Sequence, residues 1–199
     1  MTRRELLRIG LILPVLGVAW RRAGGVRAQG LGQFTTPANA PCKDDKPTPS
    51  APDAATFRAG SPERAVLVEA GMTGQKLVLT GGLRGLVCGP IKGATIDVWH
   101  ADASGLYDLK GMRFRGHQLT DANGRYRLET IVPGPYAKRA RHLNVTVSAP
   151  GKPALSTQVF FPDDPMNTKD AAFRPELAMT VTARTAETIT AAFDFVLNA

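Results

Sequence analysis

The chain has 199 residues, of which 43% are hydrophobic and 21% charged, a balance that excludes a disordered protein. The length fits one domain with an N-terminal extension. Glycine (20) and proline (15) are plentiful and aromatic residues are scarce (7%), which favours a turn-rich β protein over a helical bundle. The formal net charge is +8, and residues 1–28 carry +5 of it, because they contain six arginines and one acidic residue, Glu5. The remaining residues carry only +3, which argues against nucleic-acid binding.

The first 28 residues have the pattern of an export signal. Thr2 to Arg8 contain a twin arginine, and the apolar run 9–20 that follows is too short to span a membrane. Val26-Arg27-Ala28 supplies a small-residue cleavage site. We therefore predict a twin-arginine signal peptide over 1–28 and an exported, periplasmic or secreted protein without a stable membrane anchor. A cytosolic protein with an apolar N-terminal tail is the alternative.

The chain contains two cysteines, Cys42 and Cys88. An oxidising compartment permits them to form a disulfide, which would attach the N-terminal region to the domain. Two cysteines so far apart give little support for a thiolate-ligated metal site.

Residues 29–74 lack sustained periodicity and predict an irregular N-terminal arm. From residue 75 to 199, short runs alternate apolar and polar residues with period two, as half-buried strands require. These runs are 76–80, 94–101, 125–130, 142–148, 155–161, 179–184 and 189–197. They predict an all-β domain over 75–199, a β-sandwich of about seven or eight short strands.

Three residues suggest a metal site. Tyr107 ends a glycine-containing segment, Tyr136 follows the rigid corner Pro133-Gly134-Pro135, and His142 opens a predicted strand. Strand geometry puts residue 144 on the same face as His142. Phenolate oxygens are hard anionic donors, so two tyrosines with a histidine favour ferric iron over zinc or copper. Spacing alone leaves open that these residues only pack the fold.

The order of several motifs makes the pattern specific. Over about residues 76–175 the chain resembles the intradiol ring-cleavage dioxygenases, with the order and spacing of the motifs kept. The similar elements are Gly93 to Tyr107, Arg115-Gly116, Thr120 to Tyr126, Thr130 to Tyr136, Arg139 to Asn144 and Leu155 to Gln158.

The resemblance implies a function and a set of site residues. Tyr107, Tyr136 and His142 would bind non-haem Fe(III), and Tyr136 would also take a proton from the substrate. Arg139 would stabilise negative charge on the substrate, and Gln158 would be a polar residue of the substrate pocket. The implied reaction uses O2 to cleave a catechol-type aromatic between its two hydroxyl-bearing carbons.

One position departs from the family pattern. The second iron-binding histidine of the family would fall at position 144, where this chain has Asn144, a neutral and weaker ligand. His117, expected in a loop, is a possible substitute, whereas His100 is not expected to reach the metal.

Three readings therefore stay open. The first is an active dioxygenase, and the second is an impaired family member that binds an aromatic compound or a metal in the periplasm. The third is an unrelated transthyretin-like binding domain, in which Tyr107 and Tyr136 are structural.

Overall fold

The structure is a computed structural model that describes residues 46–53, 55–86 and 89–198. The predicted signal peptide over 1–28, the first part of the arm and the predicted Cys42–Cys88 disulfide lie outside these ranges and stay predictions.

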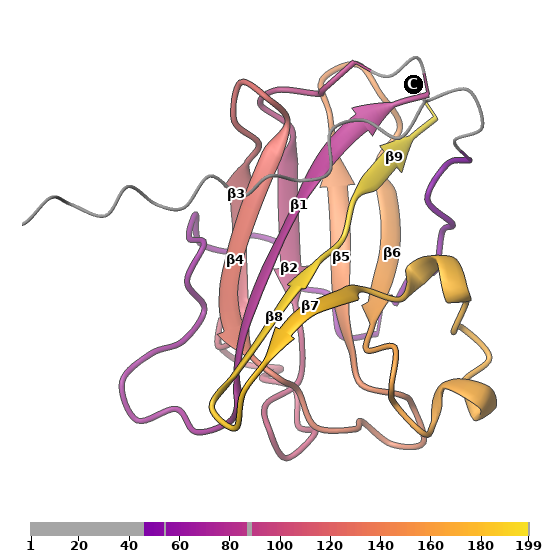
Figure 1. Ribbon diagram of the computed structural model, residues 1–199. Helices are drawn as coiled ribbons and strands as arrows, with labels where there is room; N and C mark the ends of the chain where they lie inside the picture. Colours follow the sequence, from indigo (N-terminus) through magenta and orange to yellow (C-terminus); the bar gives the residue numbers. More distant parts are fainter. Residues whose placement is uncertain (1–45, 54, 87–88, 199) are drawn as a thin grey trace, which may run out of the picture. The chain divides into compact units, whose positions relative to one another are not determined.

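Two β-sheets face each other, and the predicted all-β sandwich is confirmed (Figure 1). One sheet has the order β4-β1-β8-β7, with β9 paired to the far end of β1. Its strands are β1 (Lys76–Gly85), β4 (Arg125–Ile131), β7 (Thr180–Arg184), β8 (Thr188–Ala192) and β9 (Phe195–Leu197). The other sheet has the order β3-β2-β5-β6. Its strands are β2 (Thr95–Trp99), β3 (Arg115–Leu119), β5 (His142–Ser148) and β6 (Leu155–Phe160).

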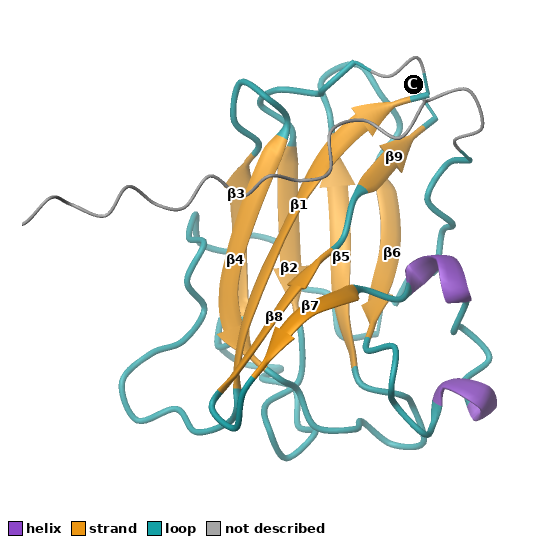
Figure 2. Ribbon diagram, in the orientation of Figure 1, coloured by secondary structure: helices purple, strands orange, loops and turns teal. Residues whose placement is uncertain are grey.

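Helical structure in the described ranges is limited to two short 3-10 helices, η2 (Asn167–Lys169) and η3 (Pro175–Leu177) (Figure 2). No helix in this part of the chain has the length and apolar character needed to cross a membrane.

The strand prediction was wrong in two places. The prediction missed β3, whose sequence RGHQL lacks an apolar alternation because it pairs at the edge of its sheet. The predicted strand 189–197 is two strands, β8 and β9, which pair in parallel with successive parts of β1. Between them the Asp194 carboxylate accepts a hydrogen bond from the Gly82 amide of β1 (2.7 Å).

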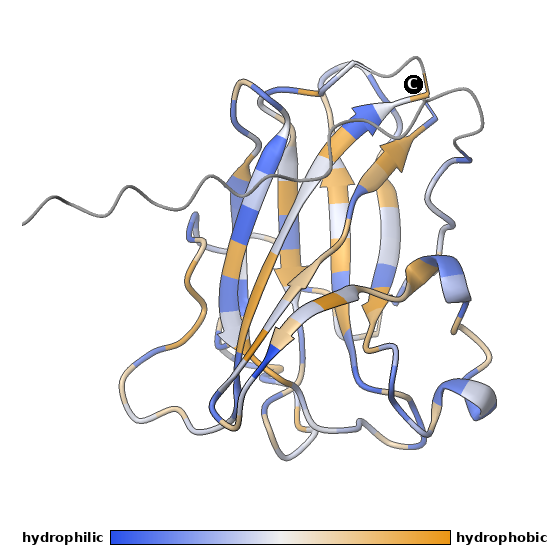
Figure 3. Ribbon diagram, viewed as in Figure 1, coloured by the Kyte–Doolittle hydropathy of each residue, from blue (hydrophilic) through white to orange (hydrophobic). Residues whose placement is uncertain are grey.

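The hydrophobic core lies between the two sheets, and the strands alternate apolar and polar residues along their length (Figure 3). On β5, Leu143, Val145 and Val147 point into this core, as the alternation predicted. His142 and Asn144 therefore point to the outer face of the β3-β2-β5-β6 sheet. Both are nevertheless buried, which means that other segments cover this face.

One covering segment is the described part of the arm, which passes behind the β3-β2-β5-β6 sheet in Figure 1. It starts beside β9, where the Thr48 amide donates to the Val196 carbonyl (2.9 Å), and then meets the free edge of β6, where the Ala51 amide donates to the Ser156 carbonyl (3.1 Å). Glu63 later forms a bridge with β3, and Val66 forms one with β4. The arm is thus fixed to both sheets.

Candidate metal centre

The loop between β2 and β3 positions Tyr107. The Asp102 carboxylate accepts hydrogen bonds from the Ser104 amide (2.8 Å) and the Leu106 amide (3.0 Å), which fixes a tight turn before the tyrosine. Gly105 sits in this turn with φ of +82°, and a Cβ there would lie 2.1 Å from the Pro135 carbonyl oxygen. Only glycine permits both the backbone angle and this close approach.

The loop after β4 brings Tyr136 to the same place. The Gly134 amide donates to the Asp102 carbonyl (2.8 Å), and a Cβ on Gly134 would lie 2.4 Å from the Ala103 carbonyl oxygen. The two loops therefore pack backbone against backbone. As a result the rings of Tyr107 and Tyr136 meet edge to face, with centroids 4.9 Å apart.

His142, the first residue of β5, faces the Tyr107 hydroxyl. Its Nδ1 donates a hydrogen bond to the Ala140 carbonyl (2.7 Å), because a carbonyl only accepts. Its Nε2 lies 3.4 Å from the Tyr107 hydroxyl. A histidine that binds a metal through one ring nitrogen commonly donates its other N–H to a backbone carbonyl in this way.

Asn144 lies beside these groups and is fully buried. Its amide nitrogen donates to the Tyr107 hydroxyl oxygen (2.9 Å), and its amide oxygen accepts from the Gln158 amide nitrogen (3.0 Å). Residue 158 is the cross-strand partner of residue 144, so the β5–β6 register sets this contact. Both ends of the Asn144 amide are used within the protein.

A charged pair extends this chain of hydrogen bonds. Arg139 donates to the Gln158 amide oxygen (2.7 Å) and to the Asp170 carboxylate (2.7 Å), which also accepts from the Ala140 amide (2.9 Å). The Asp170 side chain is 1% exposed and that of Arg139 is 29% exposed. The pair thus fixes Arg139 at the edge of the site with its guanidinium partly open to solvent.

Burial controls protonation at the centre. It raises the pKa of the Tyr107 phenol to about 12, and the hydrogen bond from Asn144 offsets only part of this effect. Burial also lowers the pKa of His142, against the opposing effect of its bond to the Ala140 carbonyl. At neutral pH the imidazole is therefore in the uncharged form that binds metals. A tightly bound cation would supply the positive charge that the Tyr107 phenolate requires.

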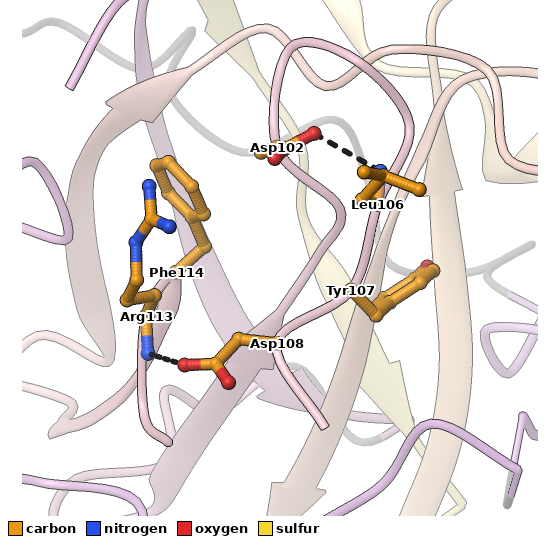
Figure 4. Close-up of a pocket in the computed structure, with 6 residues that line it drawn as sticks. All are labelled: Asp102, Leu106, Tyr107, Asp108, Arg113 and Phe114. Carbon is orange, nitrogen blue, oxygen red and sulfur yellow. Dashed lines mark hydrogen bonds between the residues drawn. The ribbon is translucent and has the colours of Figure 1, made fainter. Parts of the chain in front are cut away.

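A cavity of about 250 Å³ opens beside the Tyr107 loop (Figure 4). The Asp102 and Asp108 carboxylates accept hydrogen bonds from backbone amides of the same loop, Asp108 from Arg113 at 3.0 Å. These carboxylates therefore shape the loop. The cavity is lined by Asp102, Leu106, Tyr107, Asp108, Arg113 and Phe114.

The other two histidines lie elsewhere. His117 is on β3 rather than in a loop, two strands away from β5, and its Nδ1 contacts the Ser61 hydroxyl (3.0 Å). His100 is buried between the Ala101 carbonyl and the Thr130 hydroxyl, each 2.6 Å away. Among the described residues, no hydrogen bond or ring contact joins either histidine to His142 or Tyr107, so the structure gives no support to His117 as a substitute ligand.

The site thus gathers Tyr107, Tyr136, His142, Asn144 and Gln158, with Arg139 at its edge. Sequence reasoning missed Asp170, which follows His142 by 28 positions with no local signal. It also missed Thr56 of the arm, which accepts a hydrogen bond from the Trp99 indole (2.9 Å).

Within the described ranges no three His, Cys, Asp or Glu side chains form a group that could hold a metal ion. Any metal here would depend on the phenol oxygens.

Known proteins share this combination of fold and sequence. The family model described as Dioxygenase matches residues 53–199. Hydroxyquinol 1,2-dioxygenase of a Rhizobium species is 33% identical over 124 residues, 50% of this chain and 42% of that protein. Catechol 1,2-dioxygenase of Acinetobacter baylyi is 26% identical over 165 residues, 68% of this chain and 53% of that protein. The chain spans about half the length of these curated relatives.

A solved structure covers the chain more fully. The dioxygenase domain of a dioxygenase carbohydrate-binding protein fusion from the cellulolytic bacterium Streptomyces sp. SirexAA-E superposes with a TM-score of 0.74. It is 44% identical, and the match covers 77% of this chain and 99% of that one. The fold and these matches therefore define a β-sandwich protein of the dioxygenase class. The chain belongs to the intradiol ring-cleavage dioxygenase family.

Proposed function

We propose that the protein is a non-haem Fe(III) dioxygenase that uses O2 to cleave a catechol-type ring between its hydroxyl-bearing carbons. The observation that carries the proposal is the approach of the Tyr107 hydroxyl to within 3.4 Å of His142 Nε2, beside the ring of Tyr136. Relatives named as catechol and hydroxyquinol dioxygenases support the substrate class.

The donor set fits ferric iron. Two phenol oxygens and an imidazole nitrogen are hard to intermediate donors. Nε2 of His142 faces the Tyr107 hydroxyl and is the nitrogen left for a metal, because Nδ1 donates to the Ala140 carbonyl. Tyr107, Tyr136 and His142 would hold the ion, which when bound supplies Lewis acidity and the redox chemistry that O2 requires.

The protein's own groups would then act on the substrate. Tyr136 is 40% exposed and makes no side-chain hydrogen bond within the described ranges, so its oxygen, as a phenolate, would be open to accept a proton from a catechol hydroxyl. Arg139 is fixed by Asp170 and Gln158 with part of its guanidinium exposed, where it can stabilise negative charge on the ring. Gln158 itself is bonded to Asn144 and Arg139 and therefore acts on substrate through Arg139.

Metal analysis and oxygen uptake test the proposal. Protein purified from iron-replete cells should contain stoichiometric iron, show a visible tyrosinate-to-iron charge-transfer band and consume O2 with catechol, protocatechuate or hydroxyquinol. A colourless, iron-free preparation would contradict it. Asn144 favours a second candidate, an impaired family member that binds an aromatic compound or metal, and iron without oxygen uptake would support that function instead.

We also propose that the protein is exported through the twin-arginine route, on the basis of Arg3-Arg4 and the apolar run that follows. Cell fractionation, with Arg3→Lys and Arg4→Lys together as the comparison, tests this. Retention of the variant and export of the parent protein are expected.

A further inference from the structure

The substitution at position 144 leaves the proposed iron site short of a donor. Tyr107, Tyr136 and His142 supply three donors, and the Asn144 amide is bonded to Tyr107 on one side and to Gln158 on the other. The Asn144 oxygen already accepts a hydrogen bond from Gln158, and a neutral amide oxygen is a weaker donor to a ferric ion than a histidine nitrogen or a carboxylate.

The arm brings a carboxylate to this face of the sheet. The Asp53 carboxylate accepts a hydrogen bond from the Thr56 hydroxyl (3.2 Å), and that hydroxyl accepts one from the Trp99 indole (2.9 Å). Phe57 packs against the same indole, with ring centroids 5.2 Å apart. Trp99 is the cross-strand neighbour of Asn144 in the β2–β5 register. Asp53 is therefore held over the strand next to the position that lacks a histidine.

Thr56 connects Asp53 to the proposed ligands. Its hydroxyl donates to the Asp53 carboxylate (3.2 Å) and is a hydrogen-bonding neighbour of the Tyr107 phenol. That phenol in turn accepts a hydrogen bond from the Asn144 amide (2.9 Å). Asp53 is thus linked through a single residue to the phenol that lies beside position 144.

The other carboxylate near His142 is already engaged. Asp170 is 1% exposed and binds Arg139 and two backbone amides, those of Ala140 and Ala172. Asp53 accepts from the Ala55 amide (3.1 Å) and from Thr56, and within the described ranges no Lys or Arg pairs with it. Its negative charge is consequently available to a cation in the site.

We propose that Asp53 supplies the anionic oxygen donor that replaces the histidine missing at position 144, so that the arm completes the metal site. The inference rests on the proposed iron-binding function. It assigns the arm a direct part in metal binding, and it predicts a site with two phenolates, one imidazole and one carboxylate. Such a set is harder and more anionic than one with two histidines, and it favours the trivalent ion.

Iron affinity of Asp53→Asn, measured by chelator competition on the full chain, tests the inference. Asparagine keeps the acceptor for the Ala55 amide and removes the charge. We expect iron binding to weaken at least about tenfold, with a shifted or weaker charge-transfer band. Glu69→Gln removes an exposed carboxylate from the same arm and should change neither quantity. Asp53→Ser, which also keeps an acceptor, replaces Asp53→Asn if that variant does not fold.

A double-mutant cycle distinguishes direct binding of iron by Asp53 from a long-range effect of the Asp53 charge. If Asp53 stands in for the histidine, Asp53→Asn should cost much less iron affinity in the Asn144→His background than in the parent chain. Equal losses in both backgrounds would overturn the inference while leaving the proposed function intact, as would unchanged affinity in Asp53→Asn. An iron-free parent protein would overturn the proposed function and the inference together.

Discussion

At the scale of single residues, the buried polar groups around the site differ in what protonation does to them. His100 lies deep in the fold, 1% exposed, and is bonded to the Ala101 carbonyl and the Thr130 hydroxyl. Asp170 is also buried but carries its charge next to Arg139. The folded protein holds His100 in its neutral form and Asp170 in its charged form. Acid protonates both side chains, so both groups make the stability of the fold sensitive to low pH.

His100 should make the protein less stable below neutral pH. Burial lowers its pKa from 6.5 to about 4, so between these values the unfolded chain takes up the proton and the folded chain does not. The contribution of neutral His100 to the free energy of unfolding is fully present above pH 6.5. It is lost as the pH falls from 6.5 to about 4, and the total loss is about 3 kcal/mol. Urea unfolding of the parent protein and His100→Gln at pH 7, 5.5 and 4.5 measures this. Parallel pH profiles of the two proteins would contradict the prediction.

Arg139→Ala should destabilise the fold as well as impair the proposed reaction. It leaves the buried Asp170 carboxylate with backbone amides only, and we expect a loss of about 2–3 kcal/mol, since the partly exposed arginine limits the cost. Burial pushes the pKa of Asp170 upward, but its hydrogen bonds from Arg139 and the Ala172 and Ala140 amides hold it below 3.8. The stability from this pair is present above that pH and is lost as pH falls through the lowered pKa. The gap in unfolding free energy between parent and variant should therefore narrow in acid.

At the scale of elements, two loops rather than strands bring the tyrosines together. The β2–β3 loop and the loop after β4 meet where Gly105 and Gly134 leave no room for a side chain. Gly134→Ala would force a Cβ to within 2.4 Å of the Ala103 carbonyl oxygen, so one loop must move.

We expect Gly134→Ala to cost about 1–3 kcal/mol of stability and to weaken the iron charge-transfer band by separating Tyr107 from Tyr136. Gly89→Ala is the matched control, because nothing lies within 4 Å of a Cβ at that position. Equal unfolding midpoints and spectra for the two variants would show that the loops are not tightly packed.

The elements also show what sequence could and could not predict. Alternation in runs such as LNVTVS on β5 identified most strands and the outward face that carries His142 and Asn144, because a buried sheet face imposes period two. β3 was missed because its edge position relaxes that pattern. Tyr107, Tyr136 and His142 were found from motif order. Asp170 and Asp53 were not, because their places depend on irregular segments whose path only tertiary contacts determine.

At the scale of the whole described domain, the arm closes the sandwich on one side. The Arg64 amide donates to the His117 carbonyl of β3 (2.8 Å), and the Leu67 amide donates to the Glu129 carbonyl of β4 (2.8 Å). β3 and β4 are edge strands of different sheets, so this short segment joins the two. It covers edges that would otherwise expose unpaired backbone groups.

Leu67→Ala tests whether the arm is part of the core. Leu67 is fully buried and contacts the core cluster, whereas its neighbour Val66 is 49% exposed. We expect Leu67→Ala to lower the free energy of unfolding by about 2–5 kcal/mol and Val66→Ala by at most about 0.5 kcal/mol. Urea unfolding followed by tryptophan fluorescence and by circular dichroism should show one coincident transition in each protein. A separate early fluorescence transition, or equal effects of the two substitutions, would mean that the arm detaches independently and that the strands are stable without it.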